Sequence, residues 1–287
     1  MRLAALLGLS LLASIAALAQ QPAAKGGGNP VGTIRQLKPG LYMIPGAGAN
    51  TEVRVTPEGL IVVDGKLAGE ANYNDVMTQI RSVSPLPVKI LLLTQHHADH
   101  TGNNDRFAAA GVEIIAHKDL NENLKTYTVT PKPAPATKVF ADRQSVRLGG
   151  VEVQAIHFAP GHTGGDAIVY YPDLKVVVLS DIMTPPGTAP LVDYAGGGSA
   201  LGWLRALDAV LKLDFDLAVP GNGEPVTKPE VEAYAKKAHA VIDRARELVA
   251  SGTPADKMLE AITASNLGLT MRLPMPQGLI DELKAGK

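Results

Sequence analysis

The chain has 287 residues, of which 46% are hydrophobic and 19% charged, and its formal net charge is −1. This balance is typical of a folded globular protein and excludes an intrinsically disordered chain. A near-neutral charge also argues against a general nucleic-acid-binding protein, which usually carries a basic surplus. The sequence contains no cysteine, so it excludes disulfides, thiolate metal ligands and iron–sulfur clusters.

The first 19 residues have the pattern of a secretory signal peptide. A positive start, Met1-Arg2, precedes an apolar stretch from Leu3 to Ala19 that ends in the small-x-small sequence Ala17-Leu18-Ala19. The stretch is short for a membrane span, which needs about 20 apolar residues. We therefore expect cleavage after Ala19, a periplasmic or secreted protein, and no stable membrane anchor. Residues 20–33 are predicted to form a flexible leader.

Two successive blocks of strands and helices are predicted after the leader. The first block contains strands at 41–44, 52–55, 60–63, 88–93 and 113–116, and helices at 71–83, 103–110 and 118–124. The second contains strands at 145–148, 151–157, 167–171, 175–179 and 217–219, and helices at 201–211, 229–250, 254–264 and 276–284. One α/β domain over residues 34–287, built from two packed sheets with helices on both outer faces, fits this order, and a single open sheet fits it too.

One long Pro- and Gly-rich stretch, Pro185–Ser199, interrupts the second block. Its composition predicts a loop beside a functional site. Because the stretch carries few charges, we expect the partner to be a small-molecule substrate that is uncharged or modestly polar. We expect no nucleic-acid partner.

Three of the seven histidines fall within one short segment, residues 94–102, with the sequence TQHHADHTG. The segment directly follows the strand at 88–93, which is apolar enough to be buried on both faces. Ligands collect at the carboxyl ends of strands in α/β sheets. Imidazole and carboxylate groups are ligands that Zn²⁺ prefers. The segment therefore predicts a metal site built from nitrogen and oxygen donors.

Five motifs resemble those of the metallo-β-lactamase superfamily and occur in the family's order. Gln95-x-His97-x-Asp99-His100 resembles the H-x-H-x-D-H signature, with Gln at the first ligand position. The other four are Val62-Val63-Asp64-Gly65, Gly161-His162-Thr163-Gly164-Gly165-Asp166, Leu179-Ser180-Asp181, and Pro220-Gly221-Asn222-Gly223, in which Asn replaces the histidine of P-G-H-G. The resemblance covers residues 36–250 and implies a four-layer αββα sandwich.

The resemblance implies two neighbouring metal sites that hold one or two Zn²⁺ ions per chain, other divalent metals being possible. The ligands carried over from the motifs are Gln95, His97 and His162 for the first site, Asp99, His100 and Asn222 for the second, and Asp181 as a bridge. Asp99 would also be catalytic, because it can orient the metal-activated water and relay its proton.

Gln95 and Asn222 each place an amide where the family has an imidazole, and an amide oxygen is a weaker donor for Zn²⁺. Three outcomes stay open: a weak two-zinc site, one zinc held mainly by His97, His162 and Asp181, or an inactive relic. His96 is expected outside the set of metal ligands, because side chains of an extended segment alternate in direction. Asp64 is expected either to orient a metal ligand or to cap a turn.

These features predict an exported zinc-dependent hydrolase, in which a metal-activated water attacks an ester, thioester, lactone or amide-type carbonyl. Asp181 at the bridging position is similar to thioesterases and lactonases of the superfamily, whereas its dedicated β-lactamases usually have Cys or Ser there. A class B β-lactamase similar to the third subclass is one alternative, favoured by the export signal and Gln95. A degenerate, non-catalytic binding protein is the other, favoured by the two amides.

Overall fold

The structure is a computed structural model that describes residues 29–185 and 187–286. The predicted signal peptide and the leader up to residue 28 lie outside the described residues. Residues 29–33, the last part of the predicted leader, pack against the domain. The N–H of Ala47 donates to the carbonyl of Asn29, and the N–H of Gly32 donates to the carbonyl of Pro45, each at 2.8 Å. In this described part of the chain, no helix is long and apolar enough to cross a membrane.

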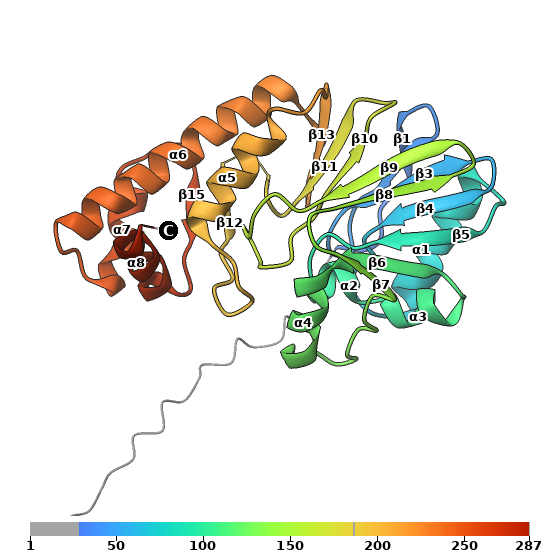
Figure 1. Cartoon of the computed structure of the whole chain (residues 1–287), viewed down its shortest axis with the longest axis horizontal. Helices are drawn as coiled ribbons and strands as arrows, with labels where there is room; N and C mark the ends of the chain where they lie inside the picture. Colours follow the sequence, from blue (N-terminus) through green and yellow to red (C-terminus); the bar gives the residue numbers. More distant parts are fainter. Residues whose placement is uncertain (1–28, 186, 287) are drawn as a thin grey trace, which may run out of the picture.

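Two mixed β-sheets lie at the centre of the fold (Figure 1). The first sheet has seven strands in sequence order, antiparallel from β1 to β4 and parallel from β4 to β7. Its strands are β1 (Arg35–Lys38), β2 (Leu41–Ile44), β3 (Thr51–Thr56), β4 (Gly59–Val63), β5 (Val88–Leu92), β6 (Glu113–His117) and β7 (Lys138–Phe140).

The second sheet has six strands in the order β14-β13-β11-β10-β9-β8, and only β11 and β13 are parallel. Its strands are β8 (Arg143–Leu148), β9 (Val151–Ile156), β10 (Ile168–Tyr171), β11 (Val176–Ser180), β13 (Leu217–Pro220) and β14 (Val226–Thr227). Hairpin pairing of β8 with β9 and of β10 with β11 confirms the turns that Gly149-Gly150 and Pro172-Asp173 predict.

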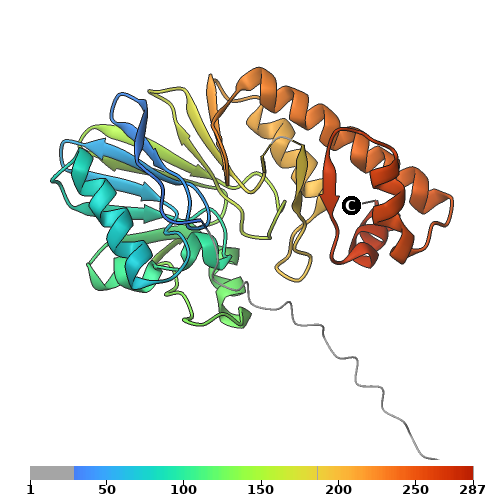
Figure 2. The same cartoon turned by 180° about the vertical axis from the view of Figure 1, so that it is seen from behind.

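Helices cover the outer face of each sheet, as the two opposite views show (Figures 1 and 2). The helices on the first sheet are α1 (Glu70–Val83), α2 (Ala98–Thr101), α3 (Asn104–Ala109) and α4 (Lys118–Thr126), and those on the second are α5 (Ala200–Val210) and α6 (Lys228–Ala250). Two further helices, α7 (Ala255–Ala264) and α8 (Pro276–Ala285), pack against α6, and α8 also contacts α5. One buried apolar cluster joins the sheets, and one joins each sheet to its helices. The predicted αββα sandwich is therefore confirmed.

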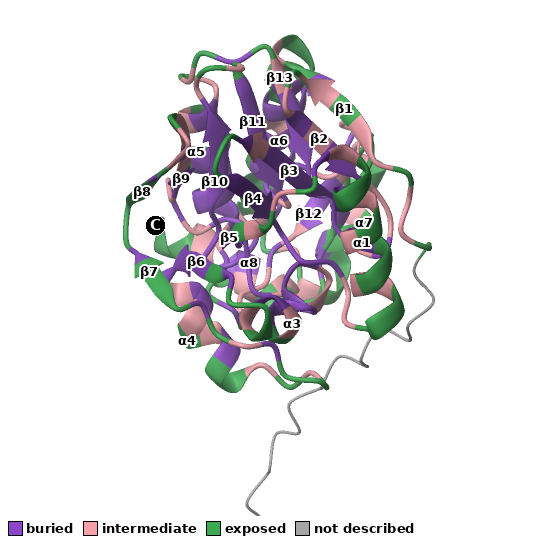
Figure 3. Ribbon diagram, turned by 90° about the vertical axis from the view of Figure 1, so that its right-hand side faces the viewer, coloured by how far each residue is buried: buried purple, intermediate pink, exposed green. Residues whose placement is uncertain are grey.

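The strands at the centre of this sandwich are mostly buried (Figure 3), and two predicted site residues stand at the ends of two of them. Every residue of β4 and of β11 is buried. Asp64 follows β4 with φ 59°, and Ser180 ends β11 with φ 48°. A left-handed backbone is costly for residues other than glycine and is often found at functional sites. The side chains of both residues contact the hydroxyl of Thr94, which donates to Oδ2 of Asp64 and lies 2.6 Å from the hydroxyl of Ser180.

The stretch Pro185–Ser199 is not entirely a loop, contrary to the sequence-based prediction. It contains β12 (Thr188–Leu191), which pairs in parallel with β15 (Thr270–Arg272) to form a small two-stranded sheet. A short strand with Pro and Gly around it has no periodic signal of its own. Its partner strand lies near the far end of the sequence, so the pairing is visible only in the three-dimensional structure.

One carboxyl group is buried inside the sandwich. Glu52 on β3 is fully buried and shares its face with Met43 and Val63, which belong to the apolar cluster between the sheets. Neither of its carboxyl oxygens has a hydrogen-bond partner among the described residues. Burial raises the pKa of Glu52 from 4.5 to about 8.

This raised pKa makes stability depend on pH. Between pH 4.5 and about 8 the folded protein keeps a proton that the unfolded chain releases, so stability falls as pH rises through that window. The greatest slope for one group is about 1.4 kcal/mol per pH unit. We predict that Glu52→Gln removes this decrease in stability. The free energy of unfolding of the variant, relative to that of the unmodified protein, should therefore increase from pH 5 to pH 8.

Urea unfolding at both pH values measures the effect. Glu58→Gln is the matched control, because Glu58 is exposed just after the same strand. An equal pH dependence in the Glu52 variant and the unmodified protein would contradict the prediction.

Candidate metal centre

The ends of several strands bring the residues of the sequence motifs to one edge of the sandwich. β5 leads into the histidine segment and α2, β9 leads into the loop with His162, β11 ends next to Asp181, and β13 ends before Asn222. Because β4, β5 and β6 are parallel, as are β11 and β13, their carboxyl ends meet at this edge.

Asp181 lies between the two predicted metal sites. Its Oδ2 atom is 3.2 Å from Nε2 of His100 and 3.4 Å from Nε2 of His162. The same oxygen accepts a hydrogen bond from Nε2 of Gln95 at 3.1 Å. Asp181 is therefore a carboxylate shared by both halves of the site.

One ring nitrogen of His97 faces one ring nitrogen of His162. Nδ1 of His162 is 2.5 Å from the carbonyl oxygen of Leu191, and Nε2 of His97 is 3.0 Å from Oδ2 of Asp193. Carbonyl and carboxylate oxygens only accept hydrogen bonds, so we assign the proton of each neutral ring to that nitrogen. The remaining lone pairs, on Nδ1 of His97 and Nε2 of His162, then face each other at 2.9 Å.

Two facing lone pairs repel unless a cation lies close to both. In tetrahedral zinc sites, Zn–N bonds of about 2.0–2.1 Å separate two nitrogens by about 3.3 Å. The observed 2.9 Å is near that value, and Asp181 adds a carboxylate oxygen 3.4 Å from His162. These three side chains therefore fit a metal ion.

A second group consists of Asp99, His100 and Asp181, whose ligand atoms lie within 4.8 Å of one another. His100 is fully buried, and its Nδ1 is 2.7 Å from Oδ2 of Asp64. Asp64 also accepts hydrogen bonds from the N–H and the hydroxyl of Thr94, at 2.9 and 2.6 Å. A carboxylate on Nδ1 fixes a proton there and orients the ring so that Nε2 faces Asp99 and Asp181, at 3.7 and 3.2 Å.

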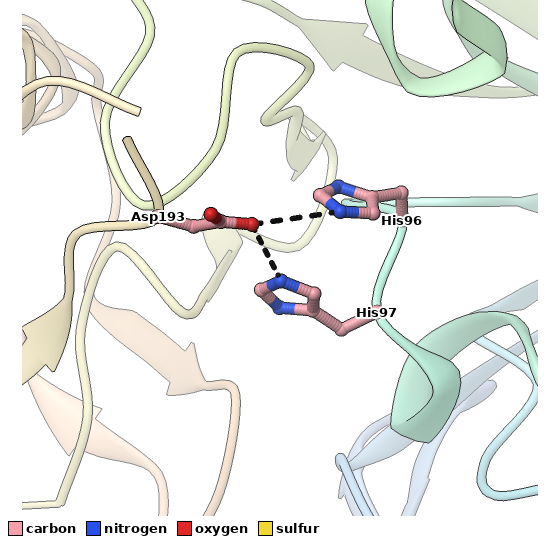
Figure 4. A group of neighbouring side chains, drawn as sticks. All are labelled: His96, His97 and Asp193. Carbon is pink, nitrogen blue, oxygen red and sulfur yellow. Dashed lines mark hydrogen bonds and ion pairs between the residues drawn. The ribbon is translucent and has the colours of Figure 1, made fainter. Parts of the chain in front are cut away.

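His96, His97 and Asp193 form a further group whose ligand atoms lie within 4.8 Å (Figure 4). Nε2 of His96 is 3.6 Å from the same Asp193 oxygen that contacts His97. Nδ1 of His96 is 3.4 Å from the amide nitrogen of Asn123, which can only donate. The proton of neutral His96 is therefore assigned to Nε2, facing Asp193. In this assignment His96 orients the carboxylate and does not offer it a lone pair.

Asp193 is a site residue that the sequence analysis missed. It lies after β12 in the stretch Pro185–Ser199 and belongs to none of the five motifs. Its Oδ1 accepts the N–H of Gly196 at 3.0 Å, and its own N–H donates to the carbonyl of His162 at 2.8 Å. The only signal in the sequence is that it is the one acidic residue of that stretch.

Both substituted ligand positions lie beside Asp181. Gln95 is engaged at both ends, because its Oε1 accepts the N–H of His97 at 2.6 Å while its Nε2 donates to Asp181. Asn222 follows Gly221, where a Cβ atom would lie 2.0 Å from Oδ1 of Asp181. Asn50 holds this turn through its N–H, which donates to the carbonyl of Gly221 at 2.7 Å.

A buried lysine supports the loop beside Asp99. The ammonium group of Lys66 donates to the carbonyls of Ile44, Gly46 and Ala49 at 2.7, 2.8 and 2.7 Å. The N–H of Ala49 in turn donates to the carbonyl of Asp99 at 3.2 Å. Burial lowers the pKa of Lys66 to about 8. Three carbonyl acceptors replace its water and stabilise the loop.

The chain belongs to the metallo-beta-lactamase superfamily, whose family model matches residues 45–222. It is 28% identical over 148 residues to 2,4-dinitroanisole O-demethylase subunit alpha of Nocardioides sp. (strain JS1661), a match that covers 51% of this chain and 44% of that protein. It is 25% identical over 179 residues to metallo-beta-lactamase IND-1 of Chryseobacterium indologenes, covering 61% of this chain and 72% of that protein.

Solved structures of the same fold agree with the architecture. The metallo-beta-lactamase FIM-1 from Pseudomonas aeruginosa, crystallised in its mono-zinc form, superposes with a TM-score of 0.63. The sequence identity is 18%, and the match covers 74% of this chain and 96% of that chain. The similarity shows a shared fold, while the geometry above defines the site in this chain.

We predict that Asp193→Ala lowers the affinity for Zn²⁺ by about 10–100-fold, which is the usual effect of removing a carboxylate that orients a histidine ligand. Without Asp193, the proton of His97 is free to move to Nδ1, the nitrogen that faces the centre. Competition with a chromophoric chelator measures the affinity. Asp208→Asn is the control, because Asp208 is half-exposed and pairs with His239. Unchanged affinity in the Asp193 variant would contradict the role of this carboxylate.

Proposed function

We propose that this chain is a zinc-dependent hydrolase that cleaves an ester, thioester, lactone or amide-type bond in a small molecule. The observation that supports it most strongly is the 2.9 Å distance between Nδ1 of His97 and Nε2 of His162 beside Asp181, where the hydrogen-bond partners of the other ring nitrogens leave two lone pairs facing each other. Such a pair makes chemical sense when a metal ion lies close to both nitrogens. Membership of the superfamily supports the same proposal.

The proposed ligands divide into two sets around the shared carboxylate. His97, His162 and Asp181 would hold the first ion, with Gln95 beside them, and Asp99, His100 and Asn222 would hold a second. Zinc bound in this way would supply Lewis acidity and would lower the pKa of a coordinated water.

The protein's own side chains have separate tasks in the reaction. The Asp99 carboxyl has 33% of its surface exposed, against 13% for Asp181, so Asp99 is the carboxylate that a substrate can reach. We assign to it the transfer of a proton from the attacking water to the leaving group. Asp64 holds His100 in place, and Asp193 does the same for His97. Both carboxylates fix ligand orientation before substrate binds.

A class B β-lactamase is the second candidate. It is supported by the similarity to IND-1, which covers 72% of that protein, and by the shared fold with FIM-1. Asp181 at the bridging position favours the broader hydrolase instead. We also propose that the chain is exported, on the pattern of residues 1–19.

Elemental analysis of the mature, tag-free protein tests the metal centre. We expect one or two zinc ions per chain. His162→Ala should lower the zinc content, whereas His239→Ala should not, because His239 lies on the surface of α6. A panel of esters, thioesters, lactones and β-lactams then identifies the bond that is cleaved, and Asp99→Asn should lower kcat by about 100-fold or more.

Two results would overturn the proposal. A protein that holds no zinc, iron or manganese, and takes up none when these ions are added, would instead be a metal-free binding protein. A metal-loaded protein that cleaves no member of the panel would contradict the proposed substrate class.

A further inference from the structure

The C-terminal helix α8 contacts the segment that carries Asp193. Glu282 on α8 accepts four hydrogen bonds from that region. Its Oε2 accepts from the hydroxyl of Tyr194 at 2.8 Å and from the N–H of Ala200 at 2.9 Å, and its Oε1 accepts from the hydroxyl of Ser199 and from the N–H of Leu201 at 3.1 Å. The segment that carries Asp193 comprises residues 192–199 and is called segment 192–199 below. The carboxylate of Glu282 therefore joins this segment and the start of α5 to helix α8.

The same segment is hydrogen bonded to the metal centre. The N–H of Asp193 donates to the carbonyl of His162 at 2.8 Å, and the N–H of Ser199 donates to the carbonyl of Gly161 at 2.9 Å. In the other direction, the N–H of Gly164 donates to the carbonyl of Gly196 at 2.8 Å. Segment 192–199 therefore lies between α8 on one side and the loop of His162 on the other.

Close packing leaves this segment little freedom. A Cβ atom at Gly278 of α8 would lie 2.7 Å from the ring of Tyr194, so only glycine permits that approach. A Cβ atom at Gly196 would lie 2.5 Å from Oδ2 of Asp193 and 2.8 Å from the ring of His96. Tyr194, the residue next to Asp193 in the chain, is therefore held against α8 by close packing as well as by its hydrogen bond to Glu282.

Helix α8 lies outside the part of the chain that the family model matches, which ends at residue 222. The contacts of Glu282 therefore involve a helix that the family model does not describe. They matter here because Gln95 is engaged by His97 and Asp181. With one imidazole fewer, the first site depends more strongly on the alignment of His97.

We propose that Glu282 is a positioning residue for the metal centre: through Tyr194 and Ser199 it holds Asp193 against Nε2 of His97, so that Nδ1 of His97 keeps its lone pair for the metal. The inference rests on the metal centre proposed above. It adds the C-terminal helix to the set of elements that determine metal affinity.

The test compares two neighbouring acidic residues of α8 in the full mature chain. Glu282→Ala removes the carboxylate that accepts two hydrogen bonds from segment 192–199 and two from the start of α5, so we expect the Zn²⁺ affinity, measured by chelator competition, to fall by about 10-fold or more. We also expect the visible absorption bands of the Co²⁺-substituted protein to shift. Asp281→Asn is the matched control, because the exposed Asp281 contacts only Gln277 in the hydrogen bonds of the described chain. It should leave both measurements unchanged.

Conservative variants separate positioning from general stability. Glu282→Gln keeps one carbonyl-type acceptor and should give an intermediate affinity, and Tyr194→Phe keeps the ring while removing a single hydrogen bond. If Glu282→Ala does not fold, the measurements on Glu282→Gln and Tyr194→Phe decide the test. Thermal unfolding of the metal-free proteins shows whether a change in affinity exceeds a change in stability.

The outcomes are distinguishable. A shifted Co²⁺ spectrum with weaker Zn²⁺ binding in the folded Glu282 variants supports the inference. An unmodified protein that binds metal, with Glu282 and Tyr194 variants of equal affinity and identical spectra, overturns the inference and leaves the proposed function standing. An unmodified protein that binds no metal overturns both.

Discussion

The position of one imidazole, that of His97, is the constraint on which the rest of the site depends. One ring nitrogen contacts the Asp193 carboxylate at 3.0 Å, and the other lies 2.9 Å from His162. A neutral imidazole has one proton and one lone pair, so the acceptor on one side decides what the other side can do. The carboxylate thereby directs a lone pair into the centre, where a second lone pair and Asp181 already lie.

The sandwich holds this geometry because the site residues follow the ends of rigid, buried strands. Parallel strands buried on both faces deliver their carboxyl ends to one edge, and left-handed residues such as Asp64 and Ser180 turn the chain there. Lys66 adds three hydrogen bonds to the loop beside Asp99. Buried polar groups with full hydrogen bonding hold a single arrangement, because any other leaves a donor or acceptor unpaired.

Sequence reasoning was most successful where chemistry and local pattern coincide. The αββα fold and the family were predicted from motifs that stand at strand ends, and both are confirmed. The ligand assignments of His97, His162, Asp99, His100 and Asp181 stay predictions, although the structure brings their atoms together. Asp193 and Glu282 were not predicted, because neither stands in a motif or at a periodic position.

The sequence by itself therefore determined the motif residues and the two amide substitutions, and the resemblance of five motifs to one family determined the fold, since residue identity and local spacing carry that information. Tertiary structure alone decided which acceptor each imidazole nitrogen faces, the pairing of β12 with β15, and the contact of α8 with segment 192–199. These features join residues that are far apart in the chain. Their geometry is fixed only when the sheets and helices pack, and no local pattern encodes it.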